Sequence, residues 1–233
     1  MRKFPILILG LVGLCLVTIP SPDSRLSGQA PGSLRIYLAR HGQTDWNVER
    51  RMQGGTDTPL NATGRQQAAE LAERLKGIRL DAVYSSTLSR SRETAEIARG
   101  QVTLTSLAGL TERRMGKFEG RRVDASDPAA AEEYARRSVV PDDTLDGGES
   151  LNQFFERVRA TVRAIRSRHA GGAILIVGHG GTNRMVLREL LGLTADSANA
   201  IEQANDELYL IEFDAGVRAR LWKLITEDRL KEL

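Results

Sequence analysis

The sequence predicts an α/β fold, a three-layer sandwich in which helices flank a mainly parallel central sheet. From residue 34 onward, short apolar runs alternate with amphipathic stretches, and this alternation is typical of strands joined by crossover helices. The apolar runs that we expect to form strands cover residues 34–39, 81–84, 102–105, 173–177 and 208–213. Residues 218–222 follow the turn signal Asp214-Ala215-Gly216 and are expected to pair with the last of these strands as a hairpin.

Two stretches between these runs have the periodicity of helices. In residues 68–75, apolar side chains recur at every third or fourth position, which places them on one helix face. Asn61 or Thr63 is expected to cap the start of that helix. Ser150 and Gln153 have the spacing of a capping box at the start of a second apolar stripe.

A charged segment interrupts this pattern at about residues 121–147. Within it, Asp127-Pro128 combines a capping side chain with a first-turn proline, which predicts a short helix over residues 129–137. The remainder is rich in charged and turn-forming residues and carries no strand signal. We therefore expect a small helical and loop insert that overhangs one end of the sheet and covers the site found there.

Residues 1–33 differ in composition from the rest of the chain. Arg2 and Lys3 precede the apolar run 5–19, and a stretch rich in proline, serine and glycine follows. The apolar run is shorter than the roughly 20 residues that span a bilayer comfortably, which favours an export signal. A membrane anchor formed by residues 4–19 is the alternative. Either way, we expect an exported protein, periplasmic or otherwise extracytoplasmic.

The composition from residue 34 to 233 is that of one ordinary globular domain. The net charge of +3 comes from 33 basic and 30 acidic residues that are spread without the basic block of nucleic-acid-binding proteins, so no nucleic-acid partner is expected. The only cysteine, Cys15, lies in the export segment. Removal of that segment would leave no thiol, which would exclude disulfides and cysteine catalysis.

Arginine and histidine side chains follow three of the expected strands. Arg40 and His41 come after the first strand, Arg90 shortly after the second and His179 directly after the fourth. Ligands in an open α/β sheet bind beyond the carboxyl ends of the strands, so we expect these four side chains to converge. Such a cationic cluster would repel itself unless an anion occupied its centre, and a phosphate dianion meets that need.

The order of these residues resembles the histidine phosphatase superfamily, which contains cofactor-dependent phosphoglycerate mutases and many phosphatases. The likeness covers roughly residues 34–213. The matching motifs are Arg40-His41-Gly42-Gln43-Thr44 with Asn47, Gln53-Gly54, Ser86 with Leu88 and Arg90, Glu112 with Gly116 and Glu119-Gly120, Gly147-Gly148-Glu149-Ser150, and His179-Gly180.

The resemblance implies a phosphatase that hydrolyses phosphomonoesters through a phosphohistidine intermediate on His41, with Glu112 as proton donor and acceptor. His41 must then be neutral at the attacking nitrogen, and an acceptor on its other nitrogen would fix that tautomer. Because Glu112 must begin protonated, activity should be better at mildly acid pH. The residues expected to bind the phosphate are Arg40, Asn47, Arg90, protonated His179 and Gly180, the last opening a helix whose amides favour an anion.

Specificity and reaction type remain open at this level. Gln53, Gly54, Arg136 and Arg137 are candidates for contacts with the rest of a small phosphorylated substrate. A 2,3-bisphosphoglycerate-dependent phosphoglycerate mutase is one alternative, because Arg136-Arg137 resemble the arginine pair of mutases, although residues 116–121 have the phosphatase form. A non-catalytic phosphate-binding module is another. No cofactor or metal is expected, since side chains already supply the cations. The oligomeric state stays open.

Overall fold

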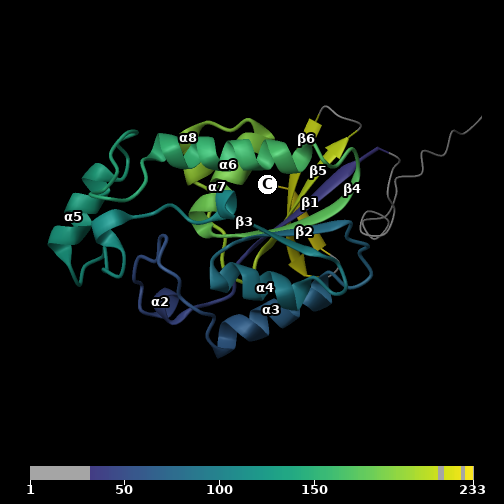
Figure 1. Cartoon of the computed structure of the whole chain (residues 1–233), viewed down its shortest axis with the longest axis horizontal. Coiled ribbons are helices and arrows are strands. Elements are labelled where there is room, and N and C mark those ends of the chain that lie inside the picture. The colour runs from purple at the N-terminus through teal and green to yellow at the C-terminus, as the bar shows by residue number, and fades with distance from the viewer. Residues whose placement is uncertain (1–31, 215–217, 227–228, 233) are drawn as a thin grey trace, which may run out of the picture.

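The computed structural model describes residues 32–214, 218–226 and 229–232, and their strands form a seven-stranded sheet (Figure 1). Its spatial order is β3-β2-β4-β1-β5-β6-β7. The first four strands of that order run parallel, and β5, β6 and β7 continue the sheet antiparallel. The strands are β1 (Leu34–Arg40), β2 (Ala82–Ser86), β3 (Leu104–Leu107), β4 (Gly172–Gly178), β5 (Leu208–Asp214), β6 (Arg218–Thr226) and β7 (Arg229–Glu232).

Helices cover both faces of the sheet and complete the expected three layers. Figure 1 shows α3 and α4 on one face and α6 and α7 on the other, with α2 and α5 beyond one end. The helices are α2 (Asp45–Val48), α3 (Ala62–Arg74), α4 (Ser89–Ala98), α5 (Pro128–Arg137), α6 (Leu151–Arg166), α7 (Gly180–Leu191) and α8 (Ala195–Asn199), with short 3-10 turns η1 (Ala108–Leu110) and η2 (Gly116–Phe118).

Alternate residues of each central strand enter different cores. In β1, Ile36 and Leu38 pack into the core that contains α6 and α7, whereas Tyr37 and Ala39 pack into the core that contains α3 and α4. Successive side chains of a strand point to opposite faces, so a strand covered on both faces must be apolar throughout. That is why the runs 34–39 and 173–177 could be recognised as buried strands.

The local signals in the sequence are confirmed at several helix starts. Asn61 caps α3, and Ser150 with Gln153 forms the expected capping box at the start of α6. Asp127 caps α5, with Pro128 in its first turn. The strand expected at 102–105 instead begins at Leu104, because Val102 lies in the turn that follows α4 and its amide donates to Arg99 O.

Two of the expected features lie wholly or partly outside the residues that the structure describes. The export segment lies in residues 1–31, and the turn expected at 214–216 lies mostly in residues 215–217. The hairpin itself is present, since β5 and β6 pair antiparallel. Within the described part of the chain, no helix is long and apolar enough to cross a membrane.

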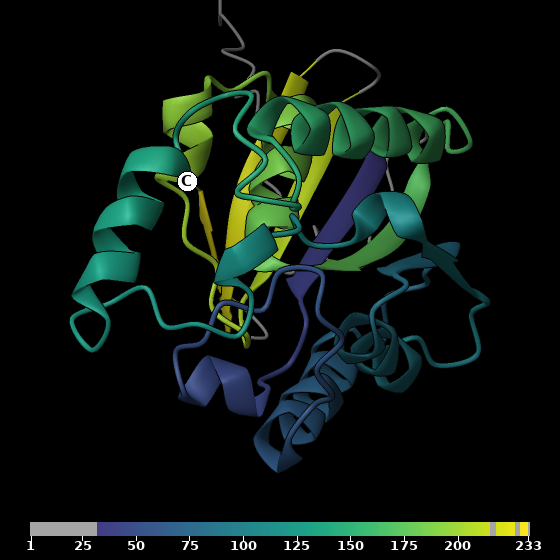
Figure 2. The ribbon, with the colours of Figure 1, turned by 60° about the vertical axis from the view of Figure 1, so that its left-hand side comes forward.

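The parallel strands end at one edge of the sheet, and the insert lies there. The carboxyl ends of β1, β2 and β4 are adjacent, because β4 pairs in parallel with both of the others. Figures 1 and 2 show α2 and α5 beyond this edge, with α5 set apart from the main body. The fold thereby brings three loops and an insert to one place.

Candidate active site

The two histidines expected to converge lie side by side at the carboxyl ends of β1 and β4. Their ring centroids are 5.0 Å apart, and His41 and His179 are only 2% and 0% exposed. The amide of His41 donates to Gly178 O at 3.0 Å, which joins the two strand ends just before the second histidine. The convergence of these residues is a direct consequence of the parallel pairing of β1 with β4.

One nitrogen of His41 is held by the backbone. Nδ1 lies 2.7 Å from Gly42 O, and because a carbonyl can only accept, Nδ1 carries the proton and Nε2 keeps its lone pair. Burial lowers the pKa of His41 well below its usual value, and the charges of Arg40 and Arg90 lower it further. The ring is therefore neutral with an unprotonated Nε2, and the carbonyl acceptor is the kind of group expected from the sequence.

His179 is held by a serine from β2. Its Nε2 lies 2.8 Å from Ser86 Oγ, and that oxygen already accepts a bond from the amide of Leu88. The hydroxyl hydrogen is thus available to Nε2, which leaves the proton of a neutral ring on Nδ1, a buried atom without a partner.

The protonated state expected for His179 concerns a site that holds phosphate, and the ligand-free site differs from it. Burial and the charges of Arg90, His41 and Arg40 lower its pKa well below the usual value. The free site therefore holds a neutral His179, rather than an imidazolium, and its Nδ1 has no acceptor among the described residues.

Arg90 is a fully buried guanidinium at 0% exposure. It comes from the first turn of α4 and donates to Gly54 O at 2.9 Å and Thr56 O at 2.8 Å. Burial lowers its pKa to about 10, which leaves it charged at neutral pH. Its Nε is buried without a partner. A buried cation that faces carbonyls, with one donor unpaired, is suited to an anionic ligand.

Arg40 has the same character. Its Nη1 donates to Gln203 O at 2.9 Å, and its Nε is buried without a partner. Burial lowers the pKa of Arg40, an effect that Glu112 opposes and Arg184 strengthens. Gly180 lies against this guanidinium, since a Cβ there would meet Arg40 Cζ at 3.6 Å.

Glu112 lies at the N-terminus of α7. Its Oε2 accepts from the Gly181 amide at 2.8 Å, and its Oε1 accepts from the Arg113 amide at 2.9 Å. A side chain at position 181 would collide with this carboxylate, because a Cβ there would lie 2.5 Å from Oε1. This corrects one expectation: the Gly181 amide is taken by Glu112, so it is not open to the phosphate.

A pocket of about 190 Å³ connects most of these residues. It is lined by Arg40, His41, Asn47, Gln53, Gly54, Arg90 and Glu112, together with Arg50, Arg51, Met52, Met115 and Val123. Asn47 Oδ1 accepts from the amide and hydroxyl of Thr44, so a bond from Asn47 to an anion must come from Nδ2. We call this pocket, with His179 behind it, the phosphate cup.

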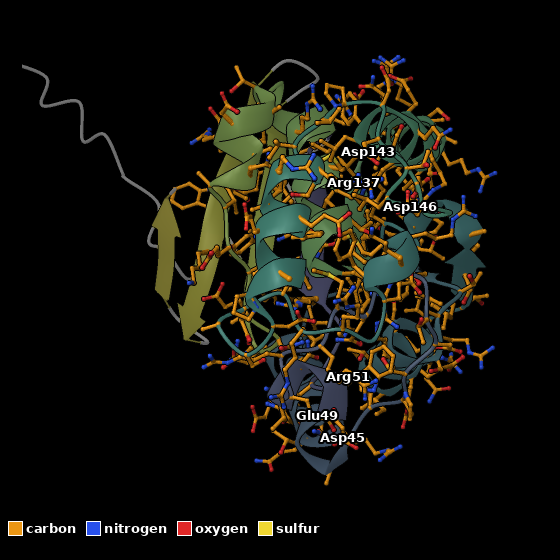
Figure 3. The ribbon with its side chains drawn as sticks, turned by 90° about the vertical axis from the view of Figure 1, so that its left-hand side faces the viewer. Asp45, Glu49, Arg51, Arg137, Asp143 and Asp146 are labelled. Carbon is orange, nitrogen blue, oxygen red and sulfur yellow. The ribbon has the colours of Figure 1, made fainter. Side chains whose placement is uncertain are left out.

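Arg137 is not placed at a substrate. Its guanidinium binds Asp143 at 2.7 Å and Asp146 at 2.9 Å, and it also pairs with Glu133. Figure 3 shows Arg137 between Asp143 and Asp146, well separated from Arg51 and Glu49 near α2. Because three carboxylates of the insert neutralise it, the specificity role expected for Arg137 is withdrawn. Arg136 is exposed and does not line the phosphate cup.

Several residues that shape the cup carried no clear sequence signal. Asn205 Nδ2 donates to His41 O at 2.7 Å, and Gln203 binds Leu38 O while its own carbonyl receives Arg40. Glu119 belongs to a motif that resembles the family but had no expected role, and it accepts from the amides of Gly55 and Met115. Its carboxylate thus ties the loop after residue 53 to the segment that carries Glu112.

Comparisons with known proteins agree with this geometry. The family described as histidine phosphatase superfamily (branch 1) matches residues 36–224. A protein of Shigella boydii named probable phosphoglycerate mutase GpmB is 36% identical over 186 residues, which cover 77% of this chain and 85% of that protein.

Solved structures show the same likeness. The α-ribazole phosphatase of Shigella flexneri superposes with a TM-score of 0.70 at 26% identity, covering 80% of this chain and 95% of the other. A mycobacterial glucosyl-3-phosphoglycerate phosphatase gives a TM-score of 0.71 at 27% identity, covering 81% and 97%. With His41, His179, Arg40 and Arg90 gathered at the end of a matching sheet, the chain belongs to the histidine phosphatase superfamily.

Proposed function

We propose that the chain hydrolyses phosphomonoesters through a phosphohistidine intermediate on His41. The observation that carries this proposal is the neutral His41 ring, whose Nδ1 is fixed by Gly42 O and whose Nε2 is left to react beside the buried Arg90 and the half-buried Arg40. Positive donors fixed around a transferring phosphoryl group supply most of the catalysis in such reactions.

In the first step, His41 Nε2 attacks phosphorus and the bond from phosphorus to the ester oxygen breaks. Glu112 gives a proton to that oxygen, so an alcohol leaves. In the second step, a water attacks the phosphohistidine and gives a proton to Glu112, the bond from phosphorus to nitrogen breaks, and inorganic phosphate leaves. Arg40, Arg90 and the Nδ1 donor of His179 hold the phosphoryl oxygens throughout, with Asn47 Nδ2 as a further donor. Glu112 lines the cup together with His41, which supports its role.

The mutase reaction is the second candidate, because a 36% identical relative carries that name. A mutase must return the phosphoryl group to a bound organic acid, so it needs cations for a second acidic group. Arg136 and Arg137 were expected to supply these cations, but Arg137 is already bound to Asp143 and Asp146. This argues against a mutase. The neighbours named as phosphatases further favour hydrolysis.

One assay separates these reactions. The full chain is incubated with a panel of phosphomonoesters, including 3-phosphoglycerate with 2,3-bisphosphoglycerate, in excess EDTA, and both free phosphate and isomerised product are measured. We expect phosphate release without added metal, faster than isomerisation. Isomerisation faster than phosphate release would show that the chain is a mutase and would overturn the proposed phosphatase activity. If a His41→Ala variant were as active as the natural chain, His41 could not be the nucleophile.

The site of action is also a proposal. The basic start and short apolar run of residues 1–33 support export to a compartment outside the cytoplasm. Fractionation of cells that express the full chain tests this. We expect the protein in the extracytoplasmic fraction, either shortened at its N-terminus or bound to the membrane, and a full-length chain in the cytoplasm would contradict export.

A further inference from the structure

A second and larger pocket, of about 460 Å³, adjoins the phosphate cup. Glu112 and Met115 line both spaces, and Gly181 continues the wall into the second one. Under the proposed function, Glu112 protonates the leaving oxygen. The larger pocket therefore begins where the leaving group begins, and its volume is in the range of small-molecule binding sites.

One face of α7 forms the floor of this pocket. Gly181, Arg184, Met185 and Arg188 all line it, and their spacing places them on a single helix face. Gly181 marks the end near Glu112 through its bond to the carboxylate. At ~1.5 Å of rise per residue, Arg184 lies ~4.5 Å and Arg188 ~10 Å farther along the helix. The pocket thus leads away from the reacting phosphate, and Arg184 is the first cation along this face.

The arginines that line the pocket differ in the groups that their guanidiniums contact. Arg113 donates to the carbonyls of Glu149, Ser138 and Asp143, and Arg188 lies over the ring of Phe155 at 3.9 Å. Arg184 is anchored by Nε, which donates to Ile201 O at 2.8 Å. Within the described part of the chain, it has no ion pair and no further side-chain hydrogen bond. Its two outer nitrogens are consequently available to a ligand.

Apolar side chains elsewhere in the lining indicate the uncharged part of that ligand. Val139 and Pro141 come from the insert, and Leu151 and Phe154 come from α6. These side chains offer a carbon skeleton apolar contact opposite the charged face of α7. A leaving group that fills this pocket therefore combines an apolar body with an anionic group that reaches Arg184, beyond Glu112 and the ester oxygen.

We propose that this pocket binds the alcohol part of the substrate and that Arg184 selects esters whose alcohol carries a second anionic group. The assignment rests on the proposed phosphatase activity. It places charge recognition on α7, whereas sequence analysis had placed it on Arg136 and Arg137 of the insert.

The test uses two esters of matched size, 4-carboxybenzyl phosphate and 4-carbamoylbenzyl phosphate, with the full chain. They differ in one charge far from the ester oxygen. We expect kcat/KM for the carboxylate ester to exceed that for the amide ester by about tenfold, the size of one charge-assisted hydrogen bond. In Arg184→Gln, this ratio should fall close to one. Arg92→Gln, an exposed arginine of α4, is the control for net charge and should keep the natural ratio.

The outcomes separate the two proposals. If the natural chain hydrolyses neither these esters nor any of the panel, the phosphatase proposal fails and this one fails with it. If it hydrolyses both esters with equal kcat/KM, or if Arg184→Gln keeps the natural ratio, the assignment of Arg184 fails while the phosphatase stands. The ratio of the two kcat/KM values is measured first on the natural chain. The proposal can therefore be contradicted even if the Arg184→Gln variant does not fold.

Discussion

Two little-exposed arginines of this protein are treated in opposite ways. In the insert, Arg137 is bound by three carboxylates, which raise its pKa above the usual value. In the phosphate cup, Arg90 faces backbone carbonyls and has no ion pair with any described residue, and burial lowers its pKa to about 10. The carboxylates of the insert thus neutralise Arg137, whereas the charge of Arg90 is left uncompensated by any neighbouring ion pair among the described residues.

The same difference separates the two regions as wholes. The insert is closed by its own ion pairs, which include Lys117 with Glu133 and Arg121 with Asp127. The lining of the cup holds four arginines, which are Arg40, Arg50, Arg51 and Arg90, and Glu112 is its one carboxylate among the described residues. Charge that the structure leaves uncompensated therefore marks the functional region better than the number of charged residues does.

The comparison makes Glu112 the most sensitive residue of the cup after the nucleophile. Glu112→Gln keeps the shape and one of the two amide contacts but cannot exchange a proton, so kcat for an alkyl phosphate should fall ~10²- to 10⁴-fold. An aryl phosphate, whose leaving oxygen needs no proton, should lose less in the first step. Steady-state kinetics on both esters measure this difference, and equal losses would show that Glu112 is not the acid.

Matched substitutions of the two arginines test the comparison itself. Arg90→Gln should lower kcat/KM by ~10²- to 10³-fold, because a positive donor at the developing charge is lost. Arg137→Gln should lower the melting temperature, because its three carboxylates lose their partner, while kcat/KM changes little. Kinetics and thermal unfolding of both variants provide the measurement. A larger kinetic loss in Arg137→Gln would return the insert arginines to the substrate site.

A smaller kinetic effect is expected from Ser86, which contacts His179 and does not line the cup itself. Ser86→Ala removes the hydroxyl that directs the proton of His179 to Nδ1, so kcat/KM should fall about tenfold, the size of one hydrogen bond. Ser86→Thr, which keeps a hydroxyl, should recover part of the loss. If the threonine and alanine variants are equally impaired, packing at residue 86 matters and the hydroxyl does not.

The buried histidines also give the cup a pH signature that the insert lacks. The pKa values of His41 and His179 are lowered in the folded state, so only the unfolded chain binds their protons as the pH falls below about 6.5. Their contribution to stability is complete above that pH and is lost below it, by ~1.4 kcal/mol per pH unit for each histidine until its folded pKa is reached.

Urea unfolding between pH 7.5 and 5 measures this effect, with a His41→Asn, His179→Asn double variant for comparison. The free energy of unfolding of the natural chain should fall more steeply with acid than that of the variant. Parallel curves would mean that the histidines of the free site are not held neutral, and the description of the cup as a buried, desolvated site would be wrong.

The sequence was informative where a feature depends on neighbouring residues. Capping at Asn61 and Ser150 needs a partner three residues away, and buried parallel strands are apolar on both faces. The placement of Arg40, His41, Arg90 and His179 after strands was sufficient to predict their convergence, because parallel strands end at one edge.

The sequence was uninformative where a role depends on distant partners. Gln203 and Asn205 bind Leu38 O and His41 O across more than 160 residues, and nothing local distinguishes them from other polar loop residues. Arg137 was misplaced because the path of residues 143–146, which supply its carboxylates, follows no periodic pattern. The lowered pKa of His179 in the free site could not be predicted, because the burial that causes it is a property of the assembled sheet.

The central claim is that His41 Nε2 forms a bond to phosphorus. Rapid quench of the full chain during turnover, followed by peptide mass spectrometry in base and 31P NMR, would measure it directly. The account expects phosphate on residue 41, bound to Nε2, with the signal accumulating in Glu112→Gln when an aryl phosphate is used. A burst of product with phosphate on another residue, or turnover with no phosphorylated protein and inversion at phosphorus, would contradict it.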